Sequence, residues 1–62
     1  MHNRYDVRQE PDGSWTIYDK FTGWPGEFDG VRMVGMREWD ARELVVLVNW
    51  GDLRTREAKG LP

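Results

Sequence analysis

Apolar residues recur at helical spacing in the segment GMREWDARELVVLVNWG, residues 35–51. Successive residues of a helix are about 100° apart around its axis, which places one broad apolar set on a single face: Met36, Ala41, Leu44, Val45, Leu47 and Val48. We expect this face to cover a core. A polar stripe of Glu38, Arg42 and Asn49 lies opposite. Gly51 is expected to end the helix, because glycine accepts the left-handed conformation found just after a helix C-terminus.

A second apolar line on this helix consists of Trp39, Val46 and Trp50, spaced by seven and then four residues. A helix that covers only one sheet does not require it, and two interpretations remain open. In the first, another part of the chain folds back over the line and completes a small core. The side chains able to do so are Phe21, Trp24 and Leu53. In the second, the line is exposed and forms a protein–protein surface, with self-association about a two-fold axis.

Two alternating segments, residues 5–10 and 14–19, flank Pro11-Asp12-Gly13. Alternation of this kind is typical of half-buried strands, and the Pro-Asp-Gly sequence suits a three-residue hairpin loop. In that register one face meets the helix, and it carries Tyr5, Val7, Trp15 and Ile17. The other face is expected to be solvated, and it carries Asp6, Arg8, Glu10, Thr16 and Tyr18.

Asp29-Gly30 predicts a second, tight hairpin of type I′. It would pair Phe28 with Val31. Pro25 lacks an amide donor, so the strand before this turn is expected to be short or irregular. The predicted fold is therefore α+β: a small antiparallel sheet, formed by a β-hairpin and a short second hairpin, packed against one C-terminal helix in the order β-β-β-β-α.

The chain has 62 residues, which predicts a single domain near the lower size limit for independent folding. We expect its ordered part to span about residues 4–51. The tail, residues 52–62, either adds a short helical turn or is disordered, since Leu53 is its only bulky apolar residue before Leu61.

The inventory of reactive side chains is poor. The chain has no cysteine and a single histidine, His2, which argues against a nucleophile–histidine pair and against a Cys/His metal site. Ser14 lies beside a turn, where serine is common. We therefore predict a non-enzymatic protein with no catalytic residue, metal or cofactor. The N-terminal segment MHNRYDVRQE has no hydrophobic stretch that resembles a signal peptide. No apolar run is long enough to span a bilayer, so we predict a cytoplasmic location without membrane binding.

An alternative function uses the outer face of the sheet. Arg8, Tyr18, Lys20 and Arg32 could together engage a single-stranded nucleic acid. Nine basic residues against eleven acidic ones disfavour this role, because such binding depends on clustered positive charge. The leading prediction is a protein–protein interaction module, either with a separate partner or as a homodimer through the helix flank.

The arrangement of DGSWTIYDKFTGWP, then VGM, then ARELVVLVN resembles that of short uncharacterised bacterial proteins with a strand-rich N-terminal half and one C-terminal helix. The resemblance covers about residues 5–49. It implies the same α+β architecture and brings no activity or functional residues with it.

Overall fold

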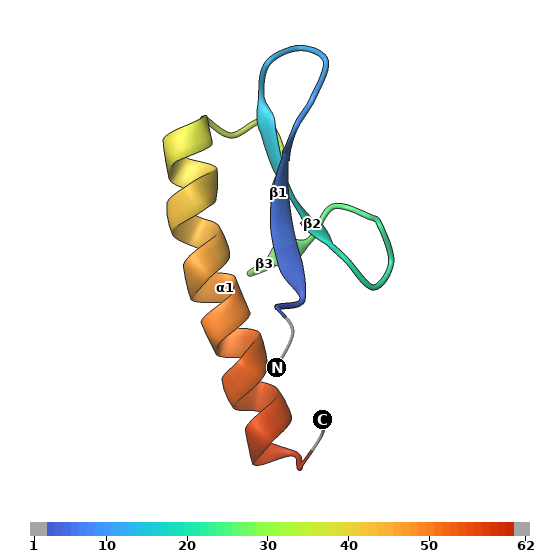
Figure 1. Ribbon diagram of the computed structural model, residues 1–62, viewed down its shortest axis with the longest axis vertical. Coiled ribbons are helices and arrows are strands. Elements are labelled where there is room, and N and C mark those ends of the chain that lie inside the picture. The colour runs from blue at the N-terminus through green and yellow to red at the C-terminus, as the bar shows by residue number, and fades with distance from the viewer. Residues whose placement is uncertain (1–2, 61–62) are drawn as a thin grey trace.

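Two β-hairpins are followed by one long helix in the computed structural model, which describes residues 3–60 (Figure 1). The strands are β1 (Tyr5–Gln9), β2 (Trp15–Asp19), β3 (Glu27–Phe28) and β4 (Val31–Arg32), and the helix is α1 (Glu38–Ala58). β1 pairs with β2, and β3 pairs with β4, both antiparallel. The predicted α+β fold and its element order are confirmed.

The register of the first hairpin is the one that its loop predicts. Val7 lies opposite Ile17, and Gln9 lies opposite Trp15. The amide of Glu10 donates to the carbonyl of Ser14 at 2.8 Å and closes the loop. Gly13 has a φ of +90°, a conformation that a glycine adopts without steric cost. The three-residue loop is confirmed.

β2 has neighbours on both of its edges. On the edge away from β1, the Ile17 amide donates to the Met33 carbonyl at 2.9 Å, and the Gly26 amide donates to the Ile17 carbonyl at 2.8 Å. The Met33 amide donates to the Gly26 carbonyl at 2.9 Å and closes this triangle. Because β2 is central, the prediction of a fully solvated outer face is wrong in part: Thr16 is buried and Tyr18 is half-buried.

The second hairpin turns at Asp29 and Gly30, whose φ angles are +54° and +78°. Positive φ at both central residues is the requirement of a type I′ turn, so this prediction holds. Phe28 pairs with Val31 as expected. Both side chains are exposed.

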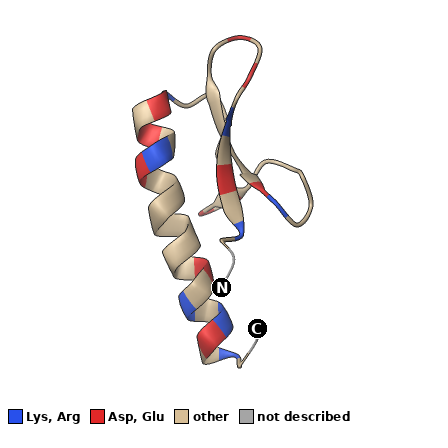
Figure 2. Ribbon diagram, viewed as in Figure 1, with Lys and Arg blue, Asp and Glu red and all other residues tan. Residues whose placement is uncertain are grey.

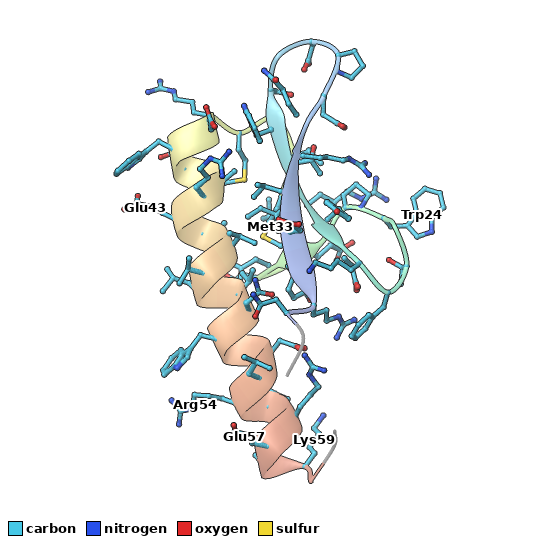
Figure 3. All side chains as sticks on the ribbon, viewed as in Figure 1. Trp24, Met33, Glu43, Arg54, Glu57 and Lys59 are labelled. Carbon is cyan, nitrogen blue, oxygen red and sulfur yellow. The ribbon has the colours of Figure 1, made fainter. Side chains whose placement is uncertain are left out.

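The core lies between α1 and the inner face of the first hairpin. Its buried members are Ile17, Met33, Ala41 and Val48. Figure 3 shows Met33 lying between the strands and the helix. Half-buried residues surround this cluster: Tyr5, Val7, Trp15, Met36, Leu44 and Val45. So small a buried set is typical of a domain near the lower size limit.

α1 is longer at its C-terminal end than predicted. It begins at Glu38 after Arg37, and Glu38 and Asp40 lie in its first turn, where negative charge complements the helix dipole. It continues through Gly51 to Ala58, so the predicted end at Gly51 is wrong. Gly51 lacks the positive φ found at Gly60.

Charged residues anchor the last two turns of α1. Arg4 contacts Asp19 at 2.9 Å and Asp52 at 3.3 Å, and Arg56 contacts Asp52 at 2.8 Å. Phe21 lies near both cations, with its ring centroid 5.6 Å from the Arg4 guanidinium carbon and 5.7 Å from that of Arg56. The hydrogen bond to Asp19 is the largest of the effects that raise the pKa of Arg4. This chain of contacts explains why residues 52–58 are helical although Leu53 is their only bulky apolar residue.

The helix is also rotated relative to the prediction. Asn49, expected in the outward polar stripe, is buried with 7% of its surface exposed. Its Oδ1 accepts a hydrogen bond from the Tyr5 amide at 2.8 Å, and its Nδ2 donates to the Tyr5 carbonyl at 3.0 Å. Two residues further along β1, the Val7 amide donates a hydrogen bond to the Asp6 carboxylate at 2.8 Å. Leu47, expected in the core, faces solvent instead.

Candidate interaction surface

Four large apolar side chains face solvent on the side of α1 opposite the sheet. Their exposed fractions are 72% for Trp39, 64% for Val46, 63% for Leu47 and 58% for Trp50. We call this set the outer helix face. Its members lie at positions 39, 46, 47 and 50, within three turns of one helix, so a rigid element holds them in fixed relative positions.

The sequence predicted three of these residues and missed Leu47. A signal for it was present in the charge pattern. Glu43 precedes Leu47 by four residues and Arg54 follows it by seven, and both spacings keep residues on one side of a helix. A side chain flanked by two charged residues on its own helix face is expected to lie at the surface.

The three side chains proposed to cover the line take different positions. Trp24 points away on the far side of the sheet (Figure 3) and is itself exposed. Phe21 lies beside Arg4 and Arg56. Leu53 is half-buried and lines a hollow with Val46 and Trp50. Leu53 therefore borders the outer helix face, and the apolar line stays exposed.

The second hairpin extends the apolar surface. Phe28 lines one hollow with Leu47 and Val48, and a second hollow with Val31 and Leu44. Phe28 and Val31 are exposed. Apolar surface therefore continues from the outer helix face around one flank of α1 to the β3–β4 hairpin. Contiguous surface of this kind marks interaction sites more often than scattered single residues do.

Charges gather at the two ends of α1 and leave its middle apolar (Figure 2). Residues 38–43 contain three acidic residues and one basic residue, while residues 52–59 contain two acidic and three basic residues. The guanidinium carbon of Arg54 lies 4.8 Å from the centroid of the Trp50 ring, which holds this cation against the outer helix face.

The four residues of the alternative nucleic-acid face are not gathered into one positive patch. Arg8 and Tyr18 lie together, with the guanidinium carbon 5.3 Å from the ring centroid. Arg8 also contacts the carboxylate of Glu10 at 3.1 Å. Lys20 lines a hollow with residues of α1, and Arg32 lies on β4, where it lines a different hollow. The acidic partner lowers the potential that Arg8 could offer to a phosphate.

The described residues, 3–60, contain no cluster of three or more His, Asp or Glu side chains able to hold a metal ion. The Ser14 hydroxyl donates to Asp12 Oδ1 at 2.7 Å, and this bond is the main reason that the pKa of Asp12 is lowered. Both residues belong to the first hairpin loop. His2 lies outside the described residues. Over the same part of the chain, no helix is long and apolar enough to cross a membrane.

Comparison of the chain with protein-family models, with curated proteins and with solved structures finds no match. Among the described residues, the outer helix face gathers four large exposed apolar side chains on one element and is the strongest candidate site.

Proposed function

We propose that this protein is a non-enzymatic protein–protein interaction module that self-associates through the outer helix face. The observation that carries the proposal is the exposure of Trp39 and Trp50 together with Val46 and Leu47 on one rigid helix. Tryptophan is enriched among the residues that dominate binding energy in protein interfaces. Each one can bury about 150–250 Å².

The small size of the core supports the same role. Among the described residues, 3–60, only four apolar side chains are buried, and small domains without disulfides or metals often gain stability by oligomerisation. The Cα radius of gyration is 11.8 Å, against about 10.6 Å for a typical compact domain of this length. The chain is elongated because α1, about 32 Å long, extends past the sheet. No other part of residues 3–60 covers the outer helix face.

Sedimentation velocity over a range from about 1 µM to about 1 mM tests the proposal. We expect wild type to form dimers and Trp39→Ala to weaken them by about tenfold or more, because the lost ring removes a large share of the apolar contact. Trp24→Ala is the matched control: Trp24 is as exposed as Trp39 but lies on the far side of the sheet. It should leave the dimer unchanged, and circular dichroism should show that both variants stay folded.

Two results would refute self-association through this face. The first is a wild-type chain that stays monomeric at every concentration. The second is a dimer that Trp24→Ala weakens as much as Trp39→Ala does.

A cytoplasmic location remains a prediction from the sequence and is proposed on that basis alone.

A further inference from the structure

Two charged residues of opposite sign flank the apolar centre of the outer helix face. Glu43 and Arg54 are eleven residues apart, which is about 16 Å along the axis and, after three full turns, a rotation of only about 20°. They therefore lie almost on one line along the helix. Figure 3 shows both side chains pointing away from the sheet.

Neither residue has an ionic partner in the part of the chain that the structure describes. The ion pairs found within residues 3–60 join Arg4, Arg8, Arg42 and Arg56 to other carboxylates. Glu43 is in none of them. Arg54 is in none of them either and instead stacks on the Trp50 ring. Opposite charges on an apolar face are thus available to a partner.

We infer that the partner is a second copy of this chain, whose α1 packs antiparallel against the first about a two-fold axis near residues 48–49. This inference rests on the proposed self-association. The axis brings Glu43 of each copy to Arg54 of the other, because a two-fold axis pairs residues equally far from it on either side. Val46, Leu47 and Trp50 lie between the two ion pairs and meet their counterparts at the centre.

The charge distribution along α1 favours an antiparallel arrangement of the two helices. The first turns of α1, residues 38–43, carry a net charge of −2, and residues 52–59 carry a net charge of +1. A parallel pair would place the two negative ends together and would set Glu43 against Glu43 and Arg54 against Arg54. An antiparallel pair joins ends of opposite sign and also opposes the two helix dipoles. Like charges across an interface exclude the wrong arrangement more strongly than exposed ion pairs favour the right one.

Charge reversal tests the pairing by sedimentation equilibrium. Glu43→Arg and Arg54→Glu, each alone, should weaken the dimer by about tenfold, because each replaces two attractive contacts with two repulsive ones. The double variant restores both contacts with their signs exchanged, so its dissociation constant should return to within about threefold of wild type. Glu57→Arg is the control, because Glu57 lies on the same helix but outside the pairing. Combined with Arg54→Glu, it should not restore the dimer that Arg54→Glu weakens.

Cysteine cross-linking gives a second readout, made simple by a chain without cysteine. Under mild oxidation, a mixture of Glu43→Cys and Arg54→Cys chains should form a disulfide-linked heterodimer, while either variant alone should form little linked dimer. A parallel pair would instead link each variant to itself.

These outcomes separate the two proposals. The antiparallel arrangement would be overturned if the double charge reversal did not restore the dimer and each cysteine variant linked to itself. If Trp39→Ala still weakened the dimer in that case, self-association through the outer helix face would stand. A monomeric wild type would overturn both.

Discussion

The helical pattern and the structure predict opposite effects of Asn49→Ala on the stability of the fold. If Asn49 were part of an exposed polar stripe, replacing it by alanine should raise the free energy of unfolding, because the helix propensity of alanine is more favourable by about 0.5 kcal/mol. In the structure, the Asn49 amide group bonds both the amide and the carbonyl of Tyr5. Removing it breaks both hydrogen bonds and leaves both groups of Tyr5 without their partner.

The expected loss follows from these two bonds. Each contributes about 0.5–1.5 kcal/mol net, and a buried group left without a partner costs about 1–3 kcal/mol. Tyr5 is half-buried, so water replaces part of what is lost. After subtraction of the gain in helix propensity, we expect Asn49→Ala to lower the free energy of unfolding by about 2 kcal/mol. That is a large share of the roughly 3–9 kcal/mol expected for a domain of this size.

Urea unfolding followed by circular dichroism at 222 nm measures the change. One low protein concentration is used throughout, because self-association makes apparent stability depend on concentration. Asn49→Asp keeps the size and one acceptor but loses the donor to the Tyr5 carbonyl, so it should also be destabilised. Glu57→Ala, at an exposed helical position, should change stability by less than about 0.5 kcal/mol. An Asn49→Ala variant as stable as wild type, or more so, would refute the structural role of this residue.

Three further predictions concern two glycines and the response to alkaline pH. Gly26→Ala should lose about 1–3 kcal/mol, because its Cβ would lie 2.8 Å from Met33 Cε and 3.0 Å from Tyr5 Cε1. Gly51→Ala should gain about 0.5–1 kcal/mol in the same urea assay, since the position is helical and open, and a loss there would contradict a helix that continues past it. Burial raises the pKa of Tyr5, with the Arg4 charge opposing it. Because the folded-state pKa is raised, this contribution to stability is complete below the unfolded value of about 10 and is lost as the pH rises through the folded value. Wild type should therefore lose more stability than Tyr5→Phe as the pH rises above about 10, and equal losses would contradict the shift.

Local sequence signals were sufficient to predict the strands and their registers. Pro11-Asp12-Gly13 and Asp29-Gly30 each permit few turn geometries, and each turn sets the register of the strands beside it. Both registers could therefore be predicted from short stretches of sequence. The same holds for Trp39, Val46 and Trp50, whose helical spacing alone placed them on one flank.

The rotation and the length of the helix could not be predicted in this way. They depend on contacts between residues more than 40 positions apart: Asn49 with Tyr5, and Asp52 with Arg4. A helical wheel contains no information about such partners. On it, Leu47 lies at the edge of the core-facing set, next to the charged residues Glu43 and Arg54. The tertiary contacts turn this edge outward.

The hydrogen bonds of Tyr5 and Val7 also affect how this protein avoids aggregation. Residues two apart along a strand direct their backbone groups to the same edge, so these two residues belong to the edge of β1 that faces away from β2. Asn49 occupies both groups of Tyr5, and Asp6 occupies the amide of Val7. A foreign strand would have to displace these side chains before it could add to the sheet. We therefore expect loss of Asn49 to expose a template for amyloid-like growth as well as to weaken the fold.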